Sequence, residues 1–221
     1  MILGQESSAL LVLVGMTREA RIVGKRGRVV VGAAAFAAAI GHERPAGILS
    51  FGICGALDPD LEIGDLLIAN SVNGTATDAD WTARLANALP AARIGPFAAS
   101  DTMAADRETK ASLRRETGAI AVDMESHLAA ASGIPFAVLR AVSDAADHSL
   151  PPAARVGLRN DGSPDIAAVL RSLIGDPRQL PALIRTARDV QTAYRALGHA
   201  LDLAGPGFGR LDFGEHFVDV A

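Results

Sequence analysis

The chain has 221 residues, a net charge of -4, and 49% hydrophobic but only 4% aromatic residues, so its core must be built from Ala, Val, Leu and Ile. This charge gives no electrostatic support for nucleic-acid binding, and no run approaches the roughly eighteen apolar residues that a membrane-spanning helix needs. The single cysteine, Cys54, excludes an internal disulfide and favours a reducing, cytoplasmic location. We expect no signal peptide, because the apolar run at 10–14 is short and lacks a basic flank.

Apolar runs that alternate with small-residue helices predict an α/β chain in which parallel strands are buried on both faces. The expected elements of the first half are a strand at 9–14, a helix start at 16–21, a strand at 28–32, a helix at 33–40 and a strand at 46–50. Thr17 is the expected N-cap of the first helix. The stretch 51–59 has glycines at 52 and 55 and is expected to be a loop in which the backbone approaches a ligand closely.

The second half continues the alternation and ends in helices. The expected elements are a turn and strand at 61–69, a polar loop at 70–80, a helix at 81–89, a strand at 94–99, helices at 106–117 and 121–131, a strand at 135–142, and helices at 166–174 and 180–203. Proline and glycine make 151–164 a predicted loop. The last helix has one apolar stripe along its length.

Two acidic residues stand out in the Ala-rich stretch 121–131, because a carboxylate in apolar surroundings is costly unless it is paired or used. Asp123 lies where this helix is expected to begin, so a role at the N-terminus of the helix accounts for it. Glu125 follows Met124 in the first turn. Its residue type and position leave both a structural salt bridge and a functional role open.

Two further candidates follow predicted strands. Glu19, between Arg18 and Arg21, comes after the first strand, at the edge where open α/β sheets bind ligands. A solvated helix start explains it equally well. Cys54 is interpreted as a small buried hydrophobe, because no histidine pairs with it recognisably. The sequence lacks a phosphate loop, a dinucleotide fingerprint, a zinc-ligand cluster and a serine-hydrolase elbow, so readings of those kinds lose their main support.

Three segments together resemble the purine nucleoside phosphorylase/methylthioadenosine nucleosidase superfamily: SFGICGALDPDLEIGD at 50–65, VDMES at 122–126 and LRAVSDAAD at 139–147. The likeness spans about residues 9–150. The chain is most similar to the hopanoid-associated phosphorylase (adenosylhopane nucleosidase) branch in its length, the EARI turn at 19–22, the SFGI stretch at 50–53 and its long C-terminal helix.

This resemblance implies a single domain over 1–221, with a C-terminal helix and tail from about residue 178. The fold would be α/β, a three-layer α/β/α sandwich with a mixed, partly barrel-like central sheet. The implied reaction is cleavage of the N-glycosidic bond of a 5′-substituted adenosine, which releases adenine. No metal and no organic cofactor are implied.

Site residues follow from the same resemblance. Asp144 takes the place of the acid that protonates purine N7. Glu125 takes the place of the acid that binds ribose hydroxyls, with Met124 packed on the sugar. Met103 and Ala104 stand where the superfamily contacts the base.

The nucleophile stays open at this point. Glu19 stands where nucleosidases carry the acid that activates water, whereas Arg18 and Arg21 would hold phosphate as the co-substrate of a phosphorylase. Ile53 replaces a polar residue that is common in the nucleosidase loop.

The substrate that the resemblance favours is adenosylhopane, in hopanoid biosynthesis. The alternatives are methylthioadenosine or adenosylhomocysteine, in methionine salvage, and a non-catalytic nucleoside-binding protein. A lipid-tailed substrate needs an apolar mouth with peripheral membrane contact, which the C-terminal helix and the phenylalanines at 208, 213 and 217 would supply. We expect a homodimer, as is usual in this superfamily.

Overall fold

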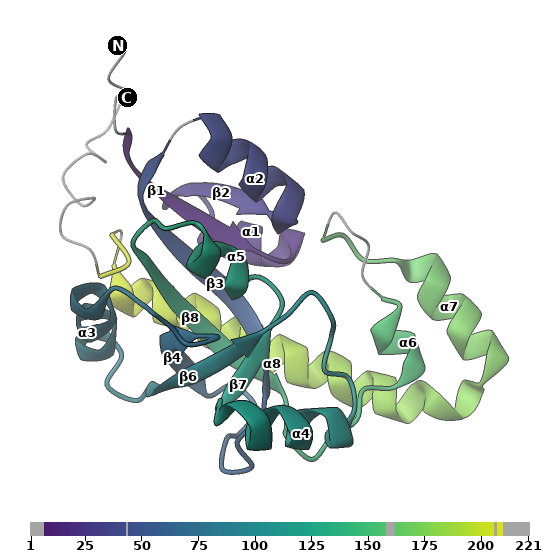
Figure 1. Ribbon diagram of the computed structural model, residues 1–221. Coiled ribbons are helices and arrows are strands. Elements are labelled where there is room, and N and C mark those ends of the chain that lie inside the picture. The colour runs from purple at the N-terminus through teal and green to yellow at the C-terminus, as the bar shows by residue number, and fades with distance from the viewer. Residues whose placement is uncertain (1–6, 43, 158–161, 206, 210–221) are drawn as a thin grey trace.

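A computed structural model describes residues 7–42, 44–157, 162–205 and 207–209 (Figure 1). In this part of the chain eight strands form one mixed sheet. They are β1 (Ser7–Val14), β2 (Arg28–Val31), β3 (Pro45–Ala56), β4 (Leu66–Val72), β5 (Thr75–Ala76), β6 (Arg93–Ala99), β7 (Ala121–Asp123) and β8 (Phe136–Asp144).

Part of this sheet closes on itself. Strand β3 pairs with β7 and β8, β8 pairs with β4, β4 pairs with β6, and β6 pairs with β7, so five strands form a closed circuit. Strand β1 pairs in parallel with β3, and β2 extends the sheet beyond β1. The predicted mixed, partly barrel-like sheet is therefore confirmed.

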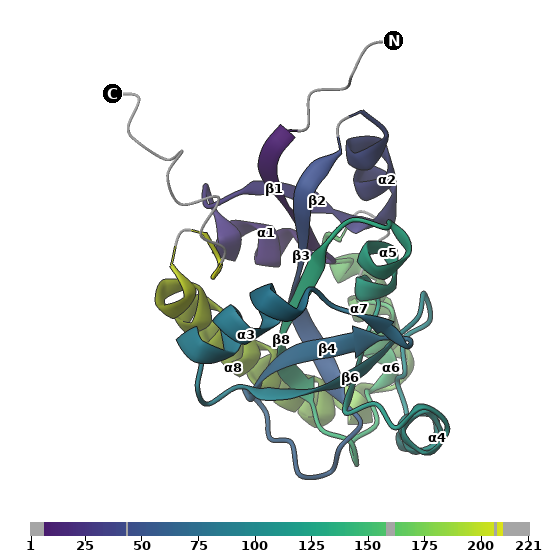
Figure 2. The same cartoon turned by 60° about the vertical axis from the view of Figure 1, so that its left-hand side comes forward.

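Helices cover both faces of the sheet (Figures 1 and 2). Helices α1 (Thr17–Val23), α3 (Ala79–Ala88) and α8 (Leu180–Ala204) pack on one face, and α2 (Gly32–His42) and α5 (Ser126–Ala131) pack on the other. The side chains of β1 alternate between the two layers: Leu10 and Val12 join the core under α8, whereas Leu11 and Leu13 join the core under α2. This alternation gives the predicted three layers.

The remaining helices lie outside these layers. Helix α4 (Arg107–Thr117) packs through Leu113 against the core beside β6 and β7. Helices α6 (Pro152–Arg155) and α7 (Ile166–Gly175) and a 3₁₀ turn (Pro177–Gln179) lead into α8 and form an arm at the right-hand side of Figure 1. Within the described segments, no helix has both the length and the apolar character that crossing a bilayer requires.

Several predicted boundaries are wrong. The expected loop at 51–59 is largely strand, because β3 continues to Ala56 and pairs with β7 and β8 there. The expected helix at 121–131 begins only at Ser126, because residues 121–123 pair with β3 and β6 as strand β7. The expected loops at 70–80 and 151–164 contain strand β5 and helix α6. At residues 121–123, pairing with distant strands overrides the helical preference of alanine.

Two predicted residue roles in the fold also change. Met16, not Thr17, is the N-cap of α1, because the Glu19 side chain at the third helical position accepts a hydrogen bond from the Met16 backbone N–H. Phe208 does not line an apolar mouth. It is wholly buried in the core, and its carbonyl accepts a hydrogen bond of 2.7 Å from Trp81 Nε1. The other tail phenylalanines, at 213 and 217, lie outside the described residues.

Candidate active site

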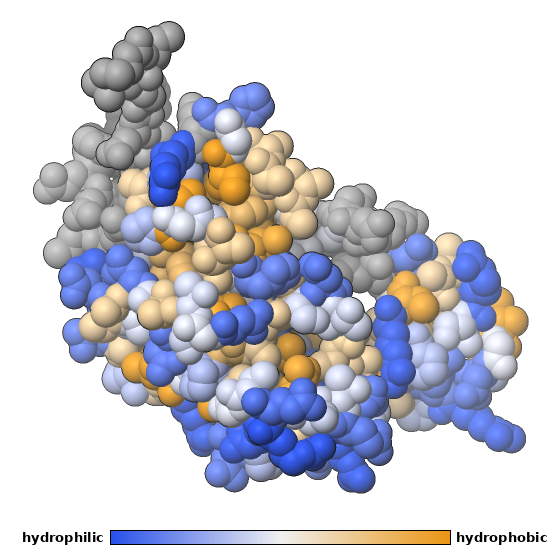
Figure 3. Space-filling view, in the orientation of Figure 1, coloured by the Kyte–Doolittle hydropathy of each residue, from blue (hydrophilic) through white to orange (hydrophobic). Residues whose placement is uncertain are grey.

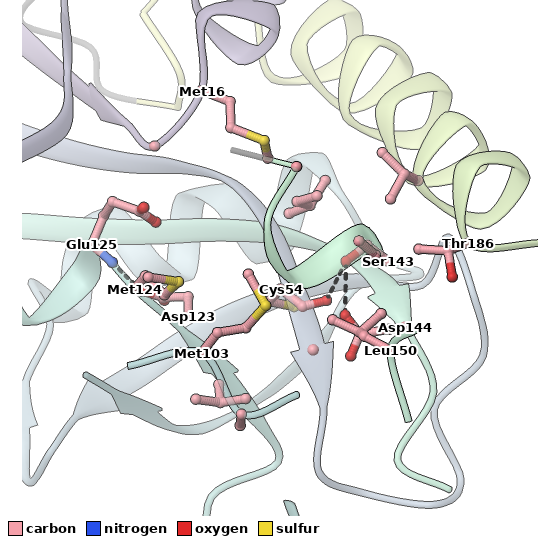
Figure 4. A pocket seen from close by; sticks show the side chains of 18 of the residues that line it. Met16, Cys54, Met103, Asp123, Met124, Glu125, Ser143, Asp144, Leu150 and Thr186 are labelled. Carbon is pink, nitrogen blue, oxygen red and sulfur yellow. Dashed lines mark hydrogen bonds between the residues drawn. The ribbon is translucent and has the colours of Figure 1, made fainter. Parts of the chain in front are cut away.

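A cavity of about 310 Å³ opens where β1, β3 and β8 reach their carboxyl ends (Figure 4). Parallel strands present their carboxyl ends at one edge of a sheet, which is where α/β proteins bind ligands. Of the residues predicted from the sequence, those that line this cavity are Glu19, Ile53, Met103, Ala104, Met124, Glu125 and Asp144. Figure 4 shows Glu125 and Asp144 at opposite sides of the cavity.

Glu19 is buried and held by three backbone N–H groups. Its Oε2 accepts hydrogen bonds from Gly15 (3.0 Å) and Met16 (2.8 Å), and its Oε1 accepts one from Ile53 (2.9 Å). Burial raises the pKa of this carboxyl group, and the charge of Arg140 and the three N–H groups offset that effect only in part. The site therefore holds a rigid carboxylate that binds a proton more readily than an exposed glutamate does.

Arg140 is the buried cation among these acids. Its Nε atom donates to Asp123 Oδ2 (3.2 Å), and its Nη2 atom donates to Ser50 Oγ (2.8 Å) and lies 3.7 Å from Glu125 Oε2. Its Nη1 atom is buried and has no hydrogen-bond partner among the described residues. The neighbouring carboxylates keep this guanidinium charged and more than offset the effect of its burial on its pKa.

Asp123 ends strand β7 and has a structural role that its sequence position does not reveal. Its Oδ1 accepts hydrogen bonds from the backbone N–H groups of Glu125 (2.9 Å) and Ser126 (2.7 Å). Burial alone would raise the pKa of Asp123, but Arg140 and the Ser126 N–H group outweigh burial, so the pKa is lowered. Asp123 therefore stays ionised and links Arg140 to the turn that carries Glu125.

Glu125 differs from Asp123, because its pKa is raised and not lowered. Burial is the main reason that its pKa is raised to about 7. The positive charge of Arg140 lowers it, and the negative charges of Glu19 and Asp123 raise it further. A structural salt bridge was one of the two roles that the sequence left open, and the contact with Arg140, 3.7 Å long, is only a weak one.

Asp144 stands at the end of β8 on the other side of the cavity. Its Oδ1 lies 3.2 Å from the hydroxyl of Ser143, which can also donate to the carbonyl of Cys54 (3.1 Å). Its Oδ2 accepts a hydrogen bond from Lys110 Nζ of helix α4. Asp144 thus faces the cavity as a carboxyl group with both oxygens engaged.

Two glycines of β3 make room for these charges. In the parallel pairing of β3 with β8, Gly52 lies opposite Arg140, and Gly55 lies opposite Asp144. A Cβ atom on Gly52 would lie 2.4 Å from Glu19 Oε1, and one on Gly55 would lie 2.8 Å from Asp144 Oδ2. The glycines were predicted to let the backbone approach a ligand, and here they leave space for the side chains of Glu19, Arg140 and Asp144.

Arg18 and Arg21, the predicted phosphate ligands, do not line the cavity. Both side chains are exposed on helix α1. The Arg18 guanidinium lies 4.6 Å from the centre of the Tyr194 ring of α8 and donates a hydrogen bond to Gln191. The structure therefore separates these two arginines from Glu125 and Asp144.

The sequence did not identify the individual residues of one wall of the cavity or most of the polar network behind it. The wall consists of apolar and small side chains from α1, the arm and α8: Met16, Leu150, Ala154, Leu183, Thr186, Ala187 and Val190. Three of these, Leu183, Ala187 and Val190, belong to the predicted apolar stripe of the last helix, the helix that was expected to supply an apolar mouth. Arg140 also gave a signal, since a lone charge in a buried strand must be paired.

Cys54 has the predicted character of a small buried hydrophobe. It is 4% exposed, and burial raises the pKa of its thiol well above the ordinary value. In the part of the chain that the structure describes, no three His, Cys, Asp or Glu side chains form a group that could hold a metal ion.

Residues 9–175 match the family described as the phosphorylase superfamily, and the chain belongs to that superfamily, as its three motifs predict. A curated relative is the 5′-methylthioadenosine/S-adenosylhomocysteine nucleosidase of Treponema pallidum (strain Nichols). It is 31% identical over an alignment of 93 residues, and the match covers 36% of this chain and 35% of the relative. The match thus spans about a third of that protein.

Solved structures share the fold at low sequence identity. The 5′-methylthioadenosine/S-adenosylhomocysteine nucleosidase of Neisseria meningitidis, in complex with methylthio-immucillin-A, superposes with a TM-score of 0.64 at 16% identity, over 88% of this chain and 96% of that one. A futalosine hydrolase mutant of Helicobacter pylori strain 26695 gives a TM-score of 0.58 at 19% identity, over 89% and 99% of the two chains. These structures confirm the predicted fold class.

Proposed function

We propose that this chain is a nucleosidase that hydrolyses the N-glycosidic bond of a 5′-substituted adenosine and releases adenine. The observation that carries the proposal is the pairing of two carboxyl groups in one cavity: buried Glu19, with its raised pKa, and Asp144, at the end of a different strand. Membership of the phosphorylase superfamily supports the reaction class, and the nucleosidase relatives support adenosine-type substrates.

Asp144, Glu125 and Glu19 each have a distinct part in this reaction. Cleavage develops positive charge on the ribose and negative charge on the departing base, so an acid at purine N7 and a carboxylate near the sugar both lower the barrier. Asp144 supplies the acid, and Glu125 binds the ribose hydroxyls opposite it. Met103 and Ala104, between β6 and α4, and Met124, between β7 and α5, line the cavity. In the proposed reaction they contact the base and the sugar.

Glu19 takes the proton of the attacking water. Burial raises its pKa, and a higher pKa makes its carboxylate a stronger base. The free Nη1 atom of Arg140 lies beside the same Gly52 gap as Glu19 Oε1, since a Cβ atom there would lie 2.7 Å from the one and 2.4 Å from the other. These two groups would offer the attacking water an N–H donor and a carboxylate acceptor.

Hydrolysis is favoured over phosphorolysis by the charge of the cavity. The ionisable carboxyl groups that line it are those of Glu19, Asp123, Glu125 and Asp144, and among the described residues no lysine or arginine lines it. A phosphate dianion would be repelled by such a lining. Arg18 and Arg21 are too exposed on α1 to compensate.

The 5′ substituent that we propose is large and apolar, with adenosylhopane of hopanoid biosynthesis as the leading candidate. The α8 wall supports this choice, because Leu183, Ala187 and Val190 offer apolar surface and no charge. The alternative substrates remain methylthioadenosine and adenosylhomocysteine, and the names of the relatives support them.

The arm beside the cavity mouth supports peripheral contact with an anionic membrane. The exposed large apolar side chains of the arm and of the adjoining first turns of α8 are Val156 after α6, Ile166, Leu170 and Ile174 on α7, and Leu180 and Ile184 on α8. Figure 3 shows apolar patches among charged ones over α7. Between residues 152 and 195 the sequence has seven arginines and four aspartates, although the whole chain carries a net charge of -4. Apolar and basic surfaces together favour anionic lipid.

The test is release of adenine from adenosylhopane or a 5′-alkyl adenosine and from methylthioadenosine, each with and without phosphate. Phosphate-independent release supports hydrolysis, and a preference for the alkyl substrate supports the lipid-tailed nucleoside. Release only with phosphate, as ribose 1-phosphate forms, would overturn hydrolysis. Binding of a nucleoside without release of adenine from any substrate would favour the non-catalytic alternative.

Membrane contact and assembly have separate tests. Co-sedimentation with vesicles that contain anionic lipid should be lost in Leu170→Asp and Ile174→Asp, while adenine release from a small substrate is kept. Equal sedimentation of the variants and the wild type would contradict membrane contact through α7. The homodimer and the cytoplasmic location stay predictions, and sedimentation velocity of the purified chain tests the first.

A further inference from the structure

Lys110 is a buried lysine in a helix whose surface is otherwise highly charged. Helix α4 begins after Asp106, and Lys110 lies in its first full turn with none of its surface exposed. Removing an ammonium group from water is costly unless its three N–H groups find acceptors. The burial of this side chain therefore has to be explained by the hydrogen-bond acceptors of its ammonium group.

All the acceptors of Lys110 belong to the short segment 144–148, which comprises the last residue of β8 and the turn that follows it. Its Nζ atom donates to Asp144 Oδ2, to the carbonyl of Ala145 (2.7 Å) and to the carbonyl of His148 (3.2 Å). Three donors meet three acceptors, so the ammonium is fully used. One cation thus fixes both a carboxyl group in the cavity and the turn that carries it.

The Asp144 carboxyl group is held from both ends as a result. Lys110 engages Oδ2 and Ser143 engages Oδ1, while Gly55 leaves the space in which the carboxyl group sits. A charge-assisted hydrogen bond of this kind is stronger and more directional than a neutral one. Small displacements of a catalytic group have large effects on rate, so its support matters for the reaction.

We propose that Lys110 is a positioning residue that acts through Asp144: its ammonium group sets the orientation of the carboxyl group that faces the base. This inference rests on the proposed function, because it assigns Asp144 to the departing base. Lys110 itself does not line the cavity. Its whole effect on the reaction passes through the Asp144 carboxyl group.

A double-mutant cycle separates this role from simple support of the fold. The variants are Lys110→Met, Asp144→Asn and the two combined, and the readouts are kcat and KM for adenine release and the affinity for free adenine by calorimetry. Lys110→Met should lower kcat by about 100-fold with a much smaller change in KM. In the Asp144→Asn background it should have no further effect.

Arg114→Met is the matched control, because Arg114 lies one turn further along α4 and pairs with Asp58 (3.2 Å) away from the cavity. It should leave kcat unchanged. If Lys110→Met fails to fold, Lys110→Gln carries the test, since its shorter side chain removes the charge but keeps a polar group with two N–H donors near the two carbonyls. Wild-type kcat in either Lys110 variant, or equal losses in both backgrounds of the cycle, would overturn the inference.

Failure of the proposed function is distinguishable from failure of this inference. If the wild type binds adenine but cleaves no nucleoside, the proposed reaction is wrong, and the cycle is then measured on adenine affinity, where additive losses would still overturn the role of Lys110. If the wild type neither binds adenine nor cleaves a nucleoside, both proposals are wrong.

Discussion

Arg140 and Asp123 form an ion pair that is closed to solvent, with 3.2 Å between Nε and Oδ2 and side-chain exposures of 0% and 1%. The guanidinium also lies near Glu125 and Ser50, and its charge acts on Glu19. One strand residue therefore connects the acids that follow β1 and β7. The pair is costly to desolvate, so it contributes less to stability than the loss of one partner would cost.

Replacement of Arg140 by methionine should destabilise the fold by about 3–5 kcal/mol, because it leaves Asp123 buried and unpaired. Arg114→Met is the control, since that arginine pairs with Asp58 at a partly exposed position where a salt bridge contributes only about 0–1 kcal/mol. Urea denaturation of both variants measures the difference. Equal free energies of unfolding for the two variants would show that loss of the buried pair costs no more than loss of the partly exposed one.

Replacement of Glu19 by glutamine should lower kcat for adenine release by about 10²- to 10⁴-fold, the usual contribution of a general base. The amide also turns an NH2 donor towards a backbone N–H donor, so the melting temperature should fall. Glu108→Gln is the control, because Glu108 is likewise in the first turn of a helix but is exposed on α4. Activity that survives in Glu19→Gln at the level of the control would remove Glu19 from the mechanism.

The sequence motifs identified those cavity residues that lie in short, recognisable segments at the ends of strands. Glu19 follows β1, Glu125 follows β7 and Asp144 ends β8, and each lies in a short segment with a recognisable pattern. The helix expected at 121–131 was wrong for the opposite reason, since residues 121–123 owe their strand conformation to pairing with β3 and β6. Local pattern is informative until a distant partner decides the conformation.

Arg140 and Lys110 show what the sequence leaves undetermined. The match of Gly52 to Arg140 depends on the register between strands that are far apart in the chain. Helix α4 carries charges all around, so hydropathy does not show that Lys110 is the one turned inwards. Both residues are paired only by tertiary contacts.

Replacement of Arg18 and Arg21 by alanine, singly or together, should leave adenine release unchanged with or without phosphate. The physical reason is their place on the exposed side of α1, with Arg18 stacked on Tyr194 and away from the cavity. Loss of the stacking and of the bond to Gln191 should cost at most about 1 kcal/mol of stability. Assays at several phosphate concentrations measure the effect, and a rate that depends on phosphate only in the wild type would restore these arginines as phosphate ligands.

Glu125 should make the fold less stable as the pH rises from about 4.5 to about 7. Its pKa is 4.5 in its unperturbed state and about 7 in the folded chain, mainly because of burial. The folded state therefore binds the proton more tightly, unfolding releases it within this window, and the stability that the proton provides is lost as the pH rises through the folded pKa. A shift of this size corresponds to about 3 kcal/mol.

The comparison that tests this contribution is wild type against Glu125→Gln, because Glu19, whose pKa is also raised, is present in both. Free energies of unfolding from urea titrations at pH 4.5, 6 and 8 should fall more steeply for the wild type, so that Glu125→Gln gains relative stability with rising pH. Glu108→Gln, exposed on α4, should follow the wild-type curve. Parallel curves for wild type and Glu125→Gln would mean that Glu125 is ionised across the whole range, and its carboxylate would then need a stronger partner than Arg140 at 3.7 Å.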